Sequence, residues 1–190
     1  MTDCETINSS TKLSENTGDK QPYSHHRSWM RTPQISDAAG IHRLISECPP
    51  LDLNSVYTYL LLSEHFGASC VLAGADDAVL GFVSAYVPPE RPNTLFVWQV
   101  AVHEQARGQS LGRRMIQHLL QRSDLAHIQF IETTVGPDNR ASRAMFASLA
   151  QKLLAPINEQ PLFERHMFGT HAHEDEPLLR IGPFATASLP

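Results

Sequence analysis

The sequence predicts an α/β (α+β) protein in which helices flank a mixed central sheet. Residues 94–102 and residues 128–135 have strand patterns, and each strand leads through a short loop into a helical pattern. Ahead of them, residues 69–87 contain two strand patterns around a turn-forming segment, which indicates an antiparallel hairpin. One sheet is therefore expected to contain both parallel and antiparallel pairs.

Two helices are predicted ahead of the hairpin. Ordered structure is expected to begin near Trp29, and Ser36 or Asp37 is placed to cap a helix whose apolar residues recur at i, i+3, i+4 and i+7. Two prolines end that helix, and a second helix follows over residues 54–66. The apolar positions are Ile41, Leu44, Ile45 and Cys48 in the first helix, and Tyr57, Leu60 and Leu61 on the core-facing side of the second.

The remaining elements follow the same reasoning from periodicity and turn residues. The hairpin strands are expected at residues 69–73 and 79–87, with a turn at residues 74–77. Helical patterns begin near Leu111 and at Asn139, and two further strands are expected at residues 162–168 and 178–181.

Length and charge limit the classes of protein to which this chain can belong. Its 190 residues suit one domain, expected over residues 29–183, with a disordered leader at residues 1–28 and a flexible tail at residues 184–190. A net charge of −5 is unlike that of proteins that bind nucleic acid or acidic lipid, so small neutral or cationic partners are expected. No apolar run reaches the roughly 18 residues of a membrane span.

The three cysteines are widely spaced and form no CxxC pair. Reduced thiols are therefore expected, and no signal-peptide pattern precedes the domain. Both observations favour a cytoplasmic protein. The cysteines are Cys4, Cys48 and Cys70.

A glycine-bearing loop at residues 105–112 lies between a predicted strand and a predicted helix. Backbone N–H groups point out of a helix start and attract anions, and glycines allow close approach to a phosphate. Arg107 can add a charge-assisted hydrogen bond. The alternative is a tight strand-to-helix connection without a ligand.

Two motifs resemble the acyl-CoA-binding motifs of GNAT N-acetyltransferases. Residues 100–113 are similar to the signature Q/R-x-x-G-x-G/A through Gln105 and Gly108, with Ser110 in place of Gly or Ala; we expect its hydroxyl to donate to a phosphate. Residues 137–146 resemble the later motif, in which Asn139 and Ser142 flank the cofactor. Those two residues have an alternative role as N-cap and first-turn residues of a helix.

The GNAT resemblance implies a fold and a co-substrate. In that fold a bulged strand splays from its parallel neighbour and opens a slot for the pantetheine arm, here beside residues 100–102. The co-substrate is acetyl-CoA, and no metal is implied, because backbone N–H groups near that slot stabilise the oxyanion. The implied cofactor contacts are Val100, Ala101, Val102, Arg107, Gly108, Gln109, Ser110, Leu111, Gly112, Arg113, Asn139 and Ser142.

Phe146 is a departure from the GNAT pattern. It stands where many GNAT enzymes have a tyrosine that protonates the leaving thiolate. Phenylalanine cannot donate a proton, but coenzyme A has an ordinary thiol acidity, so water can protonate its thiolate near neutral pH.

A longer resemblance, over residues 31–183, is to the diaminobutyrate acetyltransferases of ectoine biosynthesis. Residues 52–57, 96–100 and 173–179 carry it. It implies acetyl transfer to the 4-amino group of L-2,4-diaminobutyrate, giving N4-acetyl-2,4-diaminobutyrate for later cyclisation to an osmoprotectant. It also implies a homodimer. The expected substrate contacts are Asp52, Asn54, Tyr57, Trp98, Thr134 and Glu174.

The acceptor amine must lose a proton before it attacks. At a lysine-like pKa of about 10.4 this costs roughly 4 to 5 kcal/mol near neutral pH. Asp52 and Glu174, in loops, are the predicted bases; Glu132 shares strand parity with Thr134 but is assigned no catalytic role.

Several of these residues keep an alternative interpretation. Trp98 either walls the substrate pocket or lies in the core, and Tyr57 either contacts substrate or packs its helix. His171 and His173 form an HxH pattern that can bind zinc, although thioester transfer needs no metal. Two alternative functions remain: acetylation of another small amine, or a catalytically silent acyl-CoA-binding module.

Overall fold

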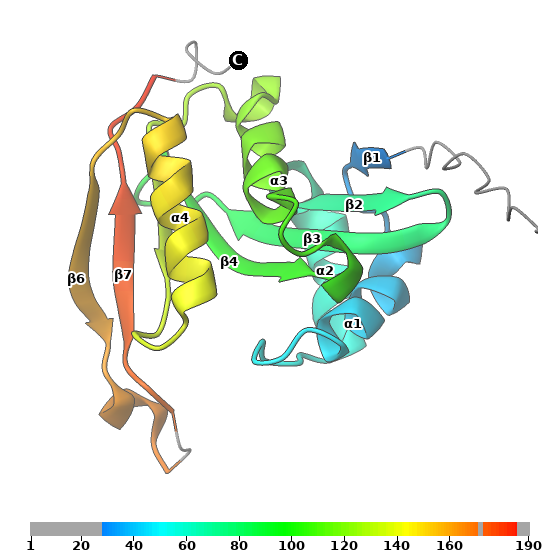
Figure 1. Ribbon diagram of the computed structural model, residues 1–190, viewed down its shortest axis with the longest axis horizontal. Helices are drawn as coiled ribbons and strands as arrows, with labels where there is room; N and C mark the ends of the chain where they lie inside the picture. The colour runs from blue at the N-terminus through cyan, green and yellow to red at the C-terminus, as the bar shows by residue number, and fades with distance from the viewer. Residues whose placement is uncertain (1–27, 171–172, 186–190) are drawn as a thin grey trace, which may run out of the picture.

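A seven-stranded sheet organises the computed structural model, which describes residues 28–170 and 173–185. Its strand order is β1-β2-β3-β4-β5-β7-β6 (Figure 1). The strands are β1 (Ser28–Arg31), β2 (Val71–Ala75), β3 (Ala78–Tyr86), β4 (Thr94–Val102), β5 (Phe130–Thr134), β6 (Ile157–Phe163) and β7 (Glu176–Ile181). Only the β4–β5 pair is parallel among the pairs of this sheet, so the predicted mixed sheet is confirmed.

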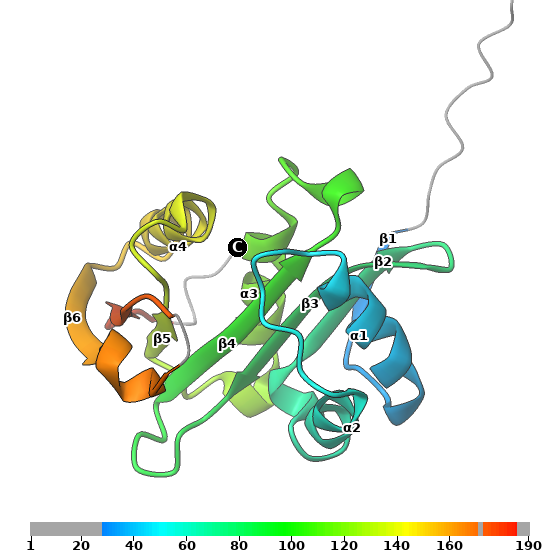
Figure 2. The same ribbon diagram turned by 90° about the horizontal axis from the view of Figure 1, so that it is seen from below.

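Helices cover both faces of the sheet, because the strands alternate their apolar side chains between two core clusters. Val71 and Val83 face the cluster beneath α3 (Leu111–Leu120) and α4 (Arg140–Lys152). Leu72 and Phe82 face the cluster beneath α1 (Ala38–Ser46) and α2 (Val56–His65). Figure 2 shows α1 and α2 beside each other on the side of the sheet away from α3.

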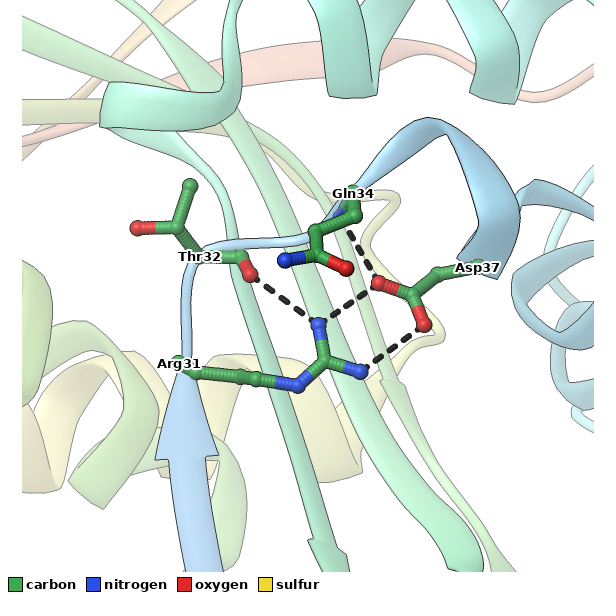
Figure 3. Close-up of polar contacts among 4 residues, drawn as sticks. All are labelled: Arg31, Thr32, Gln34 and Asp37. Atoms are coloured by element: carbon green, nitrogen blue, oxygen red, sulfur yellow. Dashed lines mark hydrogen bonds and ion pairs between the residues drawn. The ribbon is translucent and has the colours of Figure 1, made fainter.

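The entry into α1 is fixed by an ion pair (Figure 3). The Arg31 guanidinium donates to both carboxylate oxygens of Asp37, at 2.6 and 2.8 Å, and to the Thr32 carbonyl at 3.1 Å. The Gln34 amide donates to the same carboxylate at 2.7 Å. Asp37 occupies the N-cap position of α1, so the predicted helix start is confirmed, but its carboxylate bonds to Arg31 and Gln34 and makes no cap hydrogen bond to α1.

Two details of the sequence interpretation are wrong. The strand predicted at residues 162–168 is β6 at Ile157–Phe163, followed by a 3-10 helix at Arg165–Phe168. β6 is an edge strand whose residues are all exposed, so it has no alternating pattern from which to set its bounds. Tyr57 was predicted on the core-facing side of α2, but it is 65% exposed, while Tyr59 and Leu62 are buried. The apolar residues of α2 are spread around the whole helix, so the sequence does not define one buried face.

The domain bounds shift by one residue at each end. Ser28, placed in the leader, begins β1, and Phe184, placed in the tail, is buried in the core. The rest of the predicted leader, at residues 1–27, and residues 186–190 lie outside the described residues. Within the part of the chain that the structure describes, no helix is long and apolar enough to cross a bilayer.

Candidate active site between the splayed strands

The parallel strands β4 and β5 separate after three residue pairs. They pair from Thr94 with Phe130 to Phe96 with Glu132, and then β5 continues beside β7 while β4 continues beside β3. The β5-facing backbone of residues 97–102 therefore has no strand partner. Unpaired backbone N–H groups beside a cavity are ready donors for a ligand.

A bulge in β4 accompanies this separation. Gln99 pairs with Ser84 and Val97 with Ala85, so Trp98 is an extra residue without a partner on β3. The backbone N–H of Gln99 donates instead to the buried Ser84 hydroxyl at 3.1 Å. Trp98 is 42% exposed and lines a cavity between β4 and β5, so the alternative that placed it in the core is wrong.

A cavity of about 880 Å³ opens where the strands separate. This volume lies within the usual range for small-molecule sites. The walls come from the splayed strands, the start of α4, the loop before α2, the β3–β4 loop and the β6–β7 hairpin. They include the predicted site residues Asp52, Asn54, Trp98, Val100, Thr134, Asn139, Ser142 and Glu174.

Asp52 is attached to β4 through its backbone. Its carbonyl accepts a hydrogen bond from Gln99 Nε2 at 2.9 Å, and two residues later the Asn54 amide donates to the Tyr59 hydroxyl at 3.3 Å. The loop before α2 is thus joined both to the bulged strand and to the core-facing side of α2. These bonds hold the Asp52 carboxylate at the cavity wall.

Glu174 is held by the β6–β7 hairpin and by β5. The His173 ring stacks on Phe168 with centroids 3.9 Å apart, and the Asp175 carboxylate accepts from the Arg165 amide at 2.7 Å. A β-carbon at Gly136, just past β5, would lie 3.3 Å from Glu174 Oε2. Two loops distant in sequence therefore bring carboxylates to one cavity.

The predicted phosphate loop lies at the start of α3. Gly108 and Ser110 both have left-handed backbone angles, with φ of 76° and 57°. The Arg107 side chain donates to the Val102 carbonyl at 3.3 Å, which ties the loop to the end of β4. A β-carbon at Gly112 lies within 3.1 Å of Val100, so α3 begins close against the strand. The exposed loop before α3 suits an anion.

Cys48 supports this loop from the other side. Its thiol donates to the Val102 carbonyl at 3.4 Å. Burial raises the pKa of the Cys48 thiol, and the neighbouring Arg107 opposes that rise only in part. The thiol is therefore protonated near neutral pH and remains a donor.

At the start of α4, capping and cavity lining coexist. Asn139 is the N-cap, and its side-chain oxygen accepts from the Ser142 amide at 3.1 Å. Both residues also line the cavity, beside Phe146, which is 2% exposed. The two interpretations offered by the sequence are thus compatible.

The chain is similar in sequence to known acetyltransferases. Residues 38–150 match the acetyltransferase (GNAT) family. The chain is 54% identical over 181 residues to an L-2,4-diaminobutyric acid acetyltransferase of Bordetella parapertussis, with 95% of each chain covered. The chain belongs to the diaminobutyrate acetyltransferases of the GNAT family. The corresponding protein of Halomonas elongata is 44% identical over 162 residues, 85% of this chain and 84% of that protein.

Solved structures agree with this family. The diaminobutyrate acetyltransferase of Paenibacillus lautus, in complex with its substrate L-2,4-diaminobutyric acid and coenzyme A, superimposes with a TM-score of 0.81. It is 39% identical, and the match covers 84% of this chain and 96% of that one. The ribosomal-protein-S18-alanine N-acetyltransferase of Escherichia coli, 16% identical with a TM-score of 0.62 over 83% of this chain and 95% of that one, shares the fold.

Some predicted site residues of this diaminobutyrate acetyltransferase have other surroundings. Tyr57 points to solvent and is not among the residues that line the cavity, because α2 buries Tyr59 instead. Ala101 and Leu111 have buried side chains, so only their backbone can face a cofactor. Arg113 donates to Ser148 on α4 at 3.0 Å, a contact between helices.

Glu132 is buried rather than open to the cavity. Its side chain is 0% exposed and forms ion pairs with Arg180 and Arg91. His173 lines the cavity, while His171 of the HxH pattern lies outside the described residues. Glu132 and Thr134 lie on the same side of β5, so the alternation of side chains along the strand could not predict that Thr134 lines the cavity while Glu132 is buried.

Several polar residues that lie in the cavity wall were given no site role from the sequence, among them Gln99, Arg91 and Glu176. Gln99 joins the bulge to the Asp52 loop, and Arg91 and Glu176 line the cavity. Gln99 was detectable as the single polar residue in the otherwise apolar run of residues 95–102. Arg91 lies in a proline-rich loop, where no periodicity indicates which way a side chain points.

Proposed function

We propose that this diaminobutyrate acetyltransferase transfers the acetyl group of acetyl-CoA to the 4-amino group of L-2,4-diaminobutyrate, giving N4-acetyl-L-2,4-diaminobutyrate for ectoine biosynthesis. The cavity between the splayed strands carries the proposal, because Asp52 and Glu174 lie in its wall and Val100, which also lines it, lies against Gly112 at the start of α3. Relatives at 54% and 44% identity are named L-2,4-diaminobutyric acid acetyltransferases, and a similar solved structure holds this diamino acid and coenzyme A.

Acetyl-CoA fits the residues present. The exposed loop at residues 107–110 offers backbone N–H groups to the pyrophosphate, and the gap between β4 and β5 takes the pantetheine arm. Val100, Asn139 and Ser142 are the predicted cofactor contacts on that gap. The thioester carbonyl then lies beside the unpaired backbone of β4, whose N–H groups stabilise the oxyanion of the tetrahedral intermediate.

The chemistry needs one base. Glu174 or Asp52, directly or through water, removes a proton from the 4-ammonium group, and the free amine attacks the thioester carbon. The attacking nitrogen then carries one proton too many for an amide; collapse of the tetrahedral intermediate expels the coenzyme A thiolate, and loss of that second proton to water gives the neutral amide. Phe146 supplies no proton at the leaving sulfur, so water protonates that thiolate.

Release of free thiol tests the proposal. Purified protein mixed with acetyl-CoA and L-2,4-diaminobutyrate should release one thiol for each N4-acetyl product identified by NMR. Faster turnover of a polyamine or of lysine would favour the alternative of another small-amine acetyltransferase. Binding of acetyl-CoA without thiol release from any amine would indicate the silent acyl-CoA-binding module.

A homodimer and a cytoplasmic location belong to the same proposal. β6 ends the sheet with exposed residues on both faces, including Ile157, Leu162 and Phe163, and Leu154 beside it is 91% exposed. An open apolar edge favours association with a second copy. Cys48 and Cys70 are free thiols, which is typical of a reducing compartment.

A further inference from the structure

The wall of the cavity carries a cation that the proposed acetyl transfer does not use. Among the lining residues that the structure describes, Asp52, Glu174 and Glu176 are acidic and Arg91 is the arginine. Three carboxylates suit the two amino groups of a diamino acid. An arginine suits the group that distinguishes an amino acid from a simple diamine, namely the α-carboxylate.

We propose that Arg91 binds the α-carboxylate of the acceptor, that Glu132 positions Arg91, and that this pair makes the enzyme select diamino acids over diamines. The inference rests on the proposed function, since it concerns the acceptor of that same reaction.

Backbone hydrogen bonds fix Arg91 in the β3–β4 loop. Its amide donates to the Pro88 carbonyl at 2.9 Å, and its carbonyl accepts from the Thr94 amide, at the start of β4, at 3.0 Å. The side chain is 50% exposed, and its Nη2 atom lies 3.3 Å from Glu132 Oε2. The guanidinium is therefore held at the cavity wall with donors free for a ligand.

The charges around Glu132 leave a surplus on Arg91. Glu132 lies opposite Arg180 in the β5–β7 register and forms an ion pair with it through Oε1. Arg180 also lies over the Phe130 ring, 4.0 Å from its centroid. Arg180 is thus already partnered twice, and Glu132 Oε2 makes no hydrogen bond and meets Arg91 only as an ion pair. Two guanidinium groups share one carboxylate, so one positive charge remains at the cavity.

The position of Arg91 separates this role from phosphate binding. The phosphate loop follows the last residue of β4, whereas Arg91 precedes the first. A nine-residue strand spans roughly 27 Å, which is far beyond the reach of an arginine side chain. Phe96 is the last β4 residue that pairs with β5, and its partner is Glu132. Because Arg91 contacts Glu132, Arg91 lies at the end of the cavity where the two strands begin to separate.

Kinetics on two acceptors test the proposal. L-2,4-diaminobutyrate is compared with 1,3-diaminopropane, which has the same two amines at the same spacing and no carboxylate. Loss of a charge-assisted hydrogen bond predicts that Arg91→Met raises the KM for diaminobutyrate roughly 10- to 100-fold. The kcat/KM for diaminopropane and the KM for acetyl-CoA should stay within about threefold. Arg91→Lys should fall between, because it keeps the charge but loses the fork.

Two further variants locate the effect. Arg43→Met, at an exposed position on α1, is the matched control and should leave both acceptors unaffected. Glu132→Gln should raise the KM for diaminobutyrate more than that for diaminopropane, with kcat retained, and its melting curve reports whether the buried change unfolds the chain.

The outcomes distinguish the two proposals. If the unmodified protein does not acetylate diaminobutyrate, the proposed function fails and the Arg91 role fails with it. If the unmodified protein turns over diaminobutyrate but Arg91→Met leaves its KM unchanged, or impairs both acceptors equally, only the Arg91 assignment is overturned.

Discussion

Glu132, Asp52 and Glu174 differ in their surroundings, and this difference separates their roles. Glu132 is wholly buried between two arginines, so its charge is neutralised in place. Asp52 and Glu174 have exposed side chains at the cavity wall, where water and an acceptor amine can reach them. A base must reach the proton that it removes, directly or through one water, so of these three Asp52 and Glu174 suit proton transfer.

Glu174→Gln tests the base. We expect kcat to fall by about 10²- to 10⁴-fold, because an amide cannot accept the ammonium proton, while acetyl-CoA affinity stays unchanged. Thiol release and calorimetric titration with acetyl-CoA measure the two effects. Glu64→Gln, at an exposed position of α2, is the control. Full turnover in Glu174→Gln would leave Asp52 as the proposed base, and Asp52→Asn would then be tested in the same assay.

The Arg31–Asp37 pair predicts a stability effect that depends on pH (Figure 3). Hydrogen bonding from Arg31 lowers the pKa of Asp37, so its stabilisation is present above the ordinary aspartate pKa and is lost as pH falls through the lowered folded value. Asp37→Asn should therefore cost about 1 kcal/mol at pH 7 and converge with the unmodified protein in strong acid. Urea unfolding across pH measures this, with Asp77→Asn in the hairpin turn as control. A difference independent of pH would contradict it.

At the scale of elements, the β4 bulge sets the shape of the site. The extra residue Trp98 turns to the cavity, and the Ser84 hydroxyl satisfies the Gln99 amide that the bulge would leave unpaired. Gln99 then holds the Asp52 loop through its side chain. The bulge in β4 thus connects the gap between β4 and β5 with the loop that carries Asp52.

Ser84→Ala should destabilise the fold by about 1 to 3 kcal/mol, because the buried backbone N–H of Gln99 loses its acceptor. Denaturant midpoints measure the effect. Ser123→Ala, at an exposed position, should change stability by less than about 0.5 kcal/mol. Equal stability of Ser84→Ala and the unmodified protein would mean that the hydroxyl does not support the bulge.

Some of these elements are predictable from the sequence, and others are not. The bounds of β4 are as predicted, because a strand between two covered faces reads as a continuous apolar run. β6 was misplaced because an exposed edge carries no such pattern, and Tyr57 was assigned to the wrong face of α2 for a similar reason. The assembly of Asp52 with Gln99 and of Glu132 with Arg180 depends on contacts 47 and 48 residues apart, which local patterns do not encode.

At the scale of the whole molecule, β6 is an open edge of the sheet that exposes the apolar residues Ile157, Leu162 and Phe163. β6 pairs with β7 on one side only, and its residues are exposed, yet Leu162 and Phe163 at its end also line the cavity. Association of two copies along β6 would cover the edge and stiffen the hairpin that carries Glu174. The β6–β7 hairpin would then connect the proposed dimer interface with Glu174 in the cavity wall.

Ile157→Lys tests this connection, because Ile157 lies on β6 but does not line the cavity. Sedimentation should give about twice the 21.1 kDa chain mass for the unmodified protein and a monomer for the variant, since a lysine on an edge strand opposes pairing. Val56→Lys on α2, where the side chain is exposed by the same 39%, should leave the mass unchanged. A dimer that persists in Ile157→Lys would place the interface elsewhere. A monomer with an unaltered acceptor KM would show that the hairpin holds Glu174 without a partner.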